Sequence, residues 1–131
     1  MVSLTTQRVT VSAESLFQEQ YTDRAKRQYV YAYRIRISNE GDQPVRLLSR
    51  AWEVIDATGQ RRHVEGEGVV GEQPFIAPGR SHEYTSWIQF ETPLGAMLGS
   101  YVMLRPTADG RGELFQVEVP KFCHIAPELN N

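Results

Sequence analysis

The stretch "YVYAYRIRIS", residues 29–38, decides the fold class. Its odd positions all carry large apolar side chains, whereas its later even positions carry Arg34, Arg36 and Ser38. Because successive side chains of a strand point to opposite faces, this alternation produces one apolar and one partly polar face. Aromatic and β-branched residues fit such a pleated, half-buried surface. We therefore predict a β-strand, closed by a turn in "NEGDQP", where Gly41 tolerates positive φ and Pro44 blocks a helix.

Working outward from this strand, similar patterns recur along the chain. The further predicted strands are "RVTVS" (8–12), "RLLSRAWEVID" (46–56), "RRHVE" (61–65), "EYTSWIQF" (83–90), "SYVML" (100–104) and "LFQVEV" (114–119). About seven or eight short strands with frequent turn signals are typical of an all-β sandwich or barrel. The segment Ala13–Gln28 fits a helix only weakly, so an irregular loop or a further short strand remain as alternatives.

The two tryptophans are expected to differ in burial. Trp52 lies in the middle of a predicted strand and shares a face with Leu48 and Val54. Trp87 shares its face with polar residues of its own strand. We therefore predict that Trp52 is buried and that Trp87 is more exposed.

Bulk properties restrict the function classes. The chain has 131 residues, a formal net charge of −2 and one cysteine, Cys123. This length suits one domain spanning residues 1–131, and the charge gives no global attraction to nucleic acid. No apolar run approaches the roughly 20 residues of a membrane helix, and the N-terminus has no secretory pattern. We therefore expect a cytoplasmic protein that is not membrane-embedded and does not bind nucleic acid.

The segment "GEGVVG", residues 66–71, has the G-x-G-x-x-G spacing of a dinucleotide-binding turn. Such a turn needs a following helix, whose N-terminus binds the pyrophosphate. Pro74 and Pro78 stand where that helix would run, and the next predicted element is a strand. We therefore predict no nucleotide cofactor, and no cofactor of another kind.

Two interpretations of these glycines remain. In the first they are structural, and at least one is held at positive φ or is packed against backbone in a crossing between sheets. In the second their amides form an anion-binding nest, although Glu65, Glu67 and Glu72 would repel phosphate.

Several segments together resemble the ApaG family, from about Val9 to Pro127. They are "YVYAYRIRISNEG", "LLSRAWEVIDATG", "VEGEGVVGEQPFIAPG", "EYTS", "TPLGAMLGSYVM" and "FQVEVPKF". The resemblance implies an immunoglobulin or fibronectin type III-like β-sandwich. It also implies an association with cobalt resistance and magnesium efflux, the label of the bacterial members. Related domains in F-box proteins and in a polymerase-interacting protein look like protein-interaction modules. The family supplies no established catalytic residues.

Residues with catalytic or metal-binding chemistry are present but are not arranged for it. Cys123 and His124 are adjacent, so on a strand they would point to opposite faces. An extended strand would place His63, Glu65 and Glu67 on one face, where they could hold a divalent metal; an exposed polar strand face is the far commoner outcome. We predict no catalytic residues, no metal site and no enzymatic activity.

The sequence therefore favours a non-enzymatic binding module whose partner is another protein. Its candidate contact residues are those of the glycine-rich segment: Gly66, Glu67, Gly68, Val69, Val70 and Gly71. The alternative is a sensor that binds a phosphate-bearing metabolite or a divalent cation at the same segment.

Overall fold

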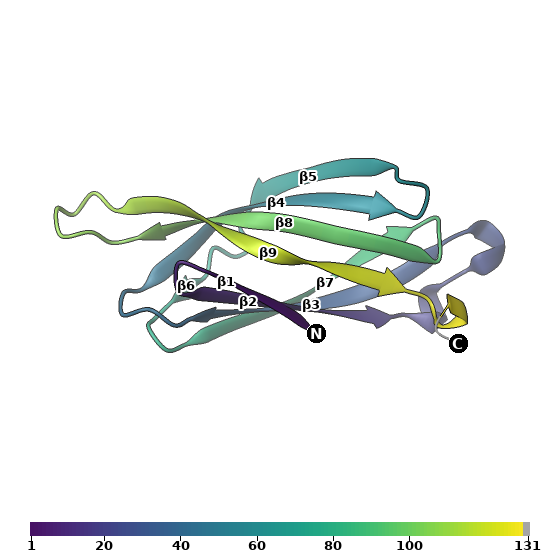
Figure 1. The fold of residues 1–131 in the computed structure, drawn as a ribbon, viewed down its shortest axis with the longest axis horizontal. Coiled ribbons are helices and arrows are strands. Elements are labelled where there is room, and N and C mark those ends of the chain that lie inside the picture. Colours follow the sequence, from purple (N-terminus) through teal and green to yellow (C-terminus); the bar gives the residue numbers. More distant parts are fainter. Residues whose placement is uncertain (130–131) are drawn as a thin grey trace.

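The chain folds as two antiparallel β-sheets packed face to face (Figure 1). This computed structural model describes residues 1–129. The first sheet has the order β1 (Val2–Thr6), β2 (Val9–Phe17), β3 (Tyr29–Asn39) and β7 (Ser81–Phe90). The second has the order β5 (Arg61–Glu67), β4 (Val45–Asp56), β8 (Leu94–Arg105) and β9 (Glu113–Ile125), with β6 (Phe75–Ile76) also paired to β4. The predicted immunoglobulin or fibronectin type III-like sandwich is confirmed.

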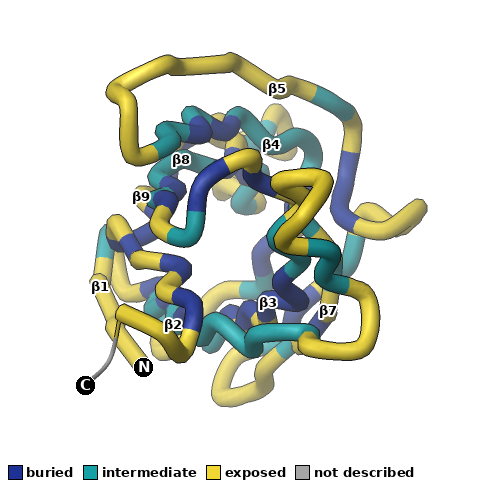
Figure 2. The backbone as a smooth tube through the Cα atoms, turned by 90° about the vertical axis from the view of Figure 1, so that its right-hand side faces the viewer, coloured by how far each residue is buried: buried dark blue, intermediate teal, exposed yellow. Residues whose placement is uncertain are grey.

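Strand β3 supplies much of the core. Tyr31, Ile35 and Ile37 are fully buried, whereas Arg34 and Arg36 between them are exposed. The same alternation runs along β9, where Phe115, Val117 and Val119 are buried. Buried stretches therefore line the space between the two sheets, and exposed stretches form the outer faces and loops (Figure 2).

The different burial of the two tryptophans is confirmed. Trp52 on β4 is 3% exposed, and its ring contacts those of Tyr33, Tyr101 and Phe122. Trp87 on β7 is 51% exposed and packs edge-on against Tyr21, which is 58% exposed. Trp87 therefore contributes an aromatic surface on the outside of the first sheet.

The structure contains more strand than the sequence predicts. Strand β1 was not predicted, β2 extends to Phe17, and β8 begins at Leu94. Of the alternatives for Ala13–Gln28, the helix is wrong: the segment continues β2 to Phe17 and then forms two short 3-10 turns, Glu19–Tyr21 and Arg24–Lys26. Strand β9 continues through Pro120 because the β8–β9 register shifts there, and proline is tolerated where the ladder is interrupted.

The two sides of the sandwich differ. On one side β9 packs against β1 and β2, and the sheets are joined there by a hydrogen bond of 2.7 Å between Ser15 Oγ and His124 Nδ1. On the other side β5 and β7 are the last strands of their sheets in the described part of the chain. This second side, between β5 and β7, is called the open side below. No helix within residues 1–129 is long and apolar enough to span a membrane.

Candidate functional site

The glycine-rich segment ends one strand and returns the chain to the same sheet. Gly66 and Glu67 are the last residues of β5, and the short β6 follows at Phe75. Both strands pair with β4. The crossing to the other sheet comes after β6, within residues 77–80, so the glycines precede the crossing and do not form it.

A tight turn lies at the centre of this segment. The amide of Val69 donates to the carbonyl of Glu72 at 2.7 Å, and the amide of Glu72 donates back to Val69 at 3.0 Å. Between them Val70 and Gly71 both have positive φ, 47° and 77°, as in the two-residue turns that suit the twist of a hairpin. Val69 is 1% exposed and belongs to the core, whereas Val70 is 62% exposed at the tip of the turn.

The structural role expected for the glycines is confirmed at Gly68. Its φ is 62°, and a Cβ at this position would overlap the carbonyl oxygen of Glu72. Gly71 needs its positive φ but has open space around it. Gly66 has an ordinary strand conformation, and its constraint comes from a side chain instead.

That side chain belongs to Arg50 on β4, which pairs with Gly66 across the ladder. Its guanidinium lies over Gly66, where a Cβ would come within 2.8 Å of it. It donates to the carbonyls of Glu67 at 3.0 Å and of Gly68 at 2.9 Å. Arg50 therefore fixes the start of the turn. Sequence reasoning missed it, because its position opposite a glycine is visible only once the strand register is known.

Backbone amides on both sides of the tip of the turn are engaged in main-chain hydrogen bonds. Gly68 donates to Leu48 at 2.8 Å, and the amides of Val69 and Glu72 bond each other's carbonyls. Strand β6 follows, not a helix. A dinucleotide-binding turn needs the free N–H groups and the dipole of a helix N-terminus. Here a strand follows the turn, so this anion-binding element is missing. On the first sheet, His82 Nε2 of β7 lies 3.8 Å from Glu72 Oε2, just after the segment.

The other chemically capable residues do not converge. Cys123 is exposed while His124 is fully buried, as expected for neighbours on a strand. His63 Nε2 lies 2.8 Å from Glu65 Oε1, and that hydrogen bond raises the pKa of His63. Within residues 1–129, no three His, Cys, Asp or Glu side chains are grouped so that they could hold a metal ion.

Alanine substitutions should separate the three glycines of the motif. Gly68→Ala should lower the free energy of unfolding most, by more than 1 kcal/mol, because positive φ and steric overlap act together. Gly71→Ala should cost about 1 kcal/mol for its φ alone. Gly66→Ala should cost less, since a flexible arginine can move away. Urea unfolding of the three variants measures the order.

The outcome that would contradict a structural role is specific. All three variants would keep their unfolding midpoints and yet fail to bind a native protein partner. The glycines would then be needed for recognition itself, and the turn geometry would not explain them.

Comparison with known proteins gives a consistent result. The sequence model of the ApaG domain matches residues 19–105. The Protein ApaG of Rhodospirillum centenum is 45% identical over 120 residues, which cover 92% of this chain and 88% of that protein. That of Proteus mirabilis is 40% identical over 127 residues, covering 97% and 98%.

A solved structure agrees with these sequence relatives. The crystal structure of the ApaA protein from Bordetella pertussis superposes with a TM-score of 0.85 at 37% identity. The match covers 91% of this chain and 94% of that one. The relatives are named as proteins and not as enzymes. This chain belongs to the ApaG family.

Proposed function

We propose that this chain is a non-enzymatic binding module that recognises another protein through the tip of its glycine-rich turn. The observation that carries the proposal is the conformation of Val70. A β-branched residue with positive φ is a steric outlier, and such strain concentrates at functional sites. Val70 has a φ of 47° and is 62% exposed, so its side chain gains little burial in return.

Glycine or asparagine would relieve the strain at this position. Valine instead presents an apolar side chain to solvent at the tip of a rigid turn. The turn is rigid because Val69 is inserted in the core and Arg50 holds the carbonyls that precede it. A preformed apolar tip of this kind suits contact with a protein surface, since little ordering entropy is lost on binding.

In this proposal, the partner protein and not this chain accounts for the cobalt and magnesium association of the family. The exposed contact at the tip is an apolar side chain, and it offers no oxygen or nitrogen ligand to a cation. The module would therefore act on cation homeostasis by binding a protein that senses or moves the ion.

Replacing Val70 with asparagine tests the proposal. Relief of backbone strain should stabilise the fold by about 1 kcal/mol, measured by urea unfolding. The same substitution should reduce recovery of the native partner, measured by quantitative capture from a lysate of the source organism. A more stable protein that binds less well cannot be explained by partial unfolding.

Val64→Asn is the matched control, because Val64 is a partly exposed valine on β5 that lies outside the turn. It should leave partner recovery unchanged. Equal recovery of the same partner by wild type and Val70→Asn would exclude the tip of the turn as the contact.

A further inference from the structure

Strand β7 presents an unpaired backbone edge on the open side. Its ladder with β3 is continuous from Tyr29↔Phe90 to Ser38↔Ser81, with no register shift. Within such a ladder the N–H and C=O groups of alternate residues point to alternate edges. The carbonyl of Arg80 accepts from Asn39 on the β3 side, so even-numbered residues bond β3. The groups of Thr85, Trp87 and Gln89 therefore face the open side.

One side chain covers part of this edge. Arg62 on β5 reaches across and donates from Nη2 to the carbonyl of Gln89 at 3.1 Å. Neighbouring Arg61 is paired with the carboxylate of Glu53 at 3.1 Å, whereas Arg62 is bound only to a carbonyl within the described residues. The charge of Arg62 is thus left without a carboxylate partner beside an open strand edge.

A groove runs along the same end of β7, between the two sheets. Its volume is about 500 Å³, and Val54, Arg61, Arg62, Trp87, Ile88 and Gln89 are among its lining residues. Asp56 also lines it, but its Oδ1 already accepts from Thr58 and Gln60 of its own turn. An added strand would direct alternate side chains into this groove, above Ile88 and Val54.

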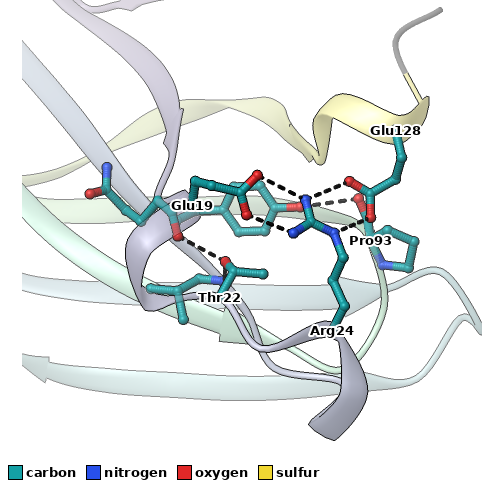
Figure 3. Close-up of polar contacts among 8 residues, drawn as sticks. Glu19, Thr22, Arg24, Pro93 and Glu128 are labelled. Atoms are coloured by element: carbon teal, nitrogen blue, oxygen red, sulfur yellow. Dashed lines mark hydrogen bonds and ion pairs between the residues drawn. The ribbon is translucent and has the colours of Figure 1, made fainter.

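The opposite face of an added strand would lie beside Trp87 and Tyr21. Beside Tyr21, Arg24 links the two 3-10 turns of this region to the C-terminal 3-10 turn, Pro127–Leu129. Figure 3 shows the guanidinium of Arg24 between the carboxylates of Glu19 and Glu128. The N···O distances to them are 2.6 and 2.8 Å. The aromatic pair is therefore a preformed surface, and aromatic anchors are enriched where proteins bind one another.

We propose that an extended segment of a partner protein adds to β7 as a new edge strand. A carboxylate of this segment then pairs with Arg62, which no longer donates to the carbonyl of Gln89. Main-chain hydrogen bonds to Thr85, Trp87 and Gln89 hold the segment. Apolar side chains alternate between the groove and the Trp87–Tyr21 surface. In the free protein, Arg62 disfavours non-specific pairing of this edge with other strands, as charged residues do on natural edge strands.

Strand addition rests on the proposed function, because both require a protein partner. The two contacts lie on different segments, however, and they can fail separately. Loss of binding in Val70→Asn alone would leave the turn as the contact. Loss of binding only in a β7 edge variant would leave strand addition as the contact.

Proline at position 85 is the sharpest test of the edge. The amide of Thr85 faces the open side, so its removal spares the ladder with β3. Thr85→Ala is the matched control, because it changes the side chain and keeps the amide. The probe is a phage-displayed library of random peptides about as long as β7, from which wild-type binders are selected and synthesised.

Selected peptides should alternate apolar residues and carry an Asp or Glu. Their affinity should fall about tenfold or more in Thr85→Pro, the loss of at least about 1.4 kcal/mol. It should stay unchanged in Thr85→Ala and fall about threefold in Arg62→Gln. In the wild type, the bound peptide should slow hydrogen exchange at the amides of Thr85 and Trp87, a readout that does not depend on how any variant folds.

Several outcomes would overturn strand addition. They are the absence of any selected binder, equal affinity in Thr85→Pro and Thr85→Ala, and unchanged exchange at the two amides. If the selected peptides carry no carboxylate and bind wild type and Arg62→Gln with equal affinity, the proposed role of Arg62 is excluded. Self-association of the wild type that Thr85→Pro abolishes would identify the added strand as a second copy of β7 and contradict a separate partner.

Discussion

Replacing Trp52 with alanine is expected to lower the free energy of unfolding by about 3–5 kcal/mol, as truncation of a large buried side chain does. Trp52 is 3% exposed and contacts the rings of Tyr33, Tyr101 and Phe122, with centroids 5.9–6.3 Å away. These rings come from β3, β8 and β9, so the indole joins both sheets. Truncation removes the apolar contacts and leaves a cavity that three rigid rings cannot fill.

The residue that packs against the indole from the neighbouring strand is a glycine, which has no side chain to fill the cavity. Trp52 pairs with Gly99 of β8, and a Cβ at Gly99 would lie 2.8 Å from the Trp52 ring. A Cβ there would also overlap the carbonyl oxygen of Ala51, so the glycine makes room for both the β4 backbone and the tryptophan ring.

Trp87→Ala is the matched control, because the same truncation is made at a half-exposed tryptophan. Apart from the lost edge contact with Tyr21, it should lower the free energy of unfolding by less than about 1 kcal/mol. Urea unfolding compares the two variants. Quenching of fluorescence by iodide should be weak in Trp87→Ala, where only the buried indole remains. An unchanged unfolding midpoint in Trp52→Ala would show that this residue is not in the core.

Much of the sandwich could be predicted because its inner strands bury one face. The alternation of β3 follows from that burial, and Phe115 and Val117 of β9 show the same pattern. Strand β1 could not be predicted, because Val2 and Leu4 are both exposed and no buried face imposes a pattern. The Pro120 region of β9 was missed for another reason. A register shift permits a proline that sequence rules exclude from strands.

The candidate site was predictable only in part. The glycine spacing and the two prolines suffice to predict a structural turn, and Gly68 confirms it. Val69 is buried and Val70 is exposed because of the conformation of the turn, and two adjacent valines in the sequence do not reveal that conformation. The position of Arg62 beside Gln89 depends on two edge strands from different sheets meeting on the open side. No local pattern encodes that contact.

The second large effect concerns His124, which links the sheets on the closed side. It is fully buried, and its Nδ1 bonds Ser15 Oγ at 2.7 Å while Nε2 has no partner within residues 1–129. The rings of Tyr31, Tyr33, Phe90 and Phe122 surround it, and none of them is charged at neutral pH. Burial among these rings lowers the pKa of His124 from 6.5 to about 4.

The sign of the effect on stability follows from proton binding. Between pH 6.5 and about 4 the unfolded chain binds a proton at His124 and the folded chain does not. Acidification therefore favours unfolding across this window, and the stability is fully present above pH 6.5. The difference between the two pKa values corresponds to about 3 kcal/mol lost by pH 4.

Other groups with shifted pKa values act outside this interval. Hydrogen bonds from Arg24 lower the pKa of Glu128 to about 2, and those from Thr58 lower that of Asp56. Their contribution is lost as pH falls below the ordinary carboxyl range, near 4. The pKa of exposed His63 is raised by Glu65, so the stability that its protonation adds is gained above pH 6.5 and is already present below it. The interval from pH 6.5 to 5 is therefore governed by His124.

The double variant Ser15→Ala/His124→Leu isolates this contribution, because it removes the titrating ring together with the hydroxyl that would otherwise lose its partner. Whatever its stability at pH 7, its free energy of unfolding should change little between pH 6.5 and 5, while that of the wild type should fall steadily. Urea unfolding at closely spaced pH values gives both curves. Parallel curves for the two proteins would mean that His124 accepts its proton as easily in the fold as in the unfolded chain, and a ring sealed among four aromatic neighbours could not do so.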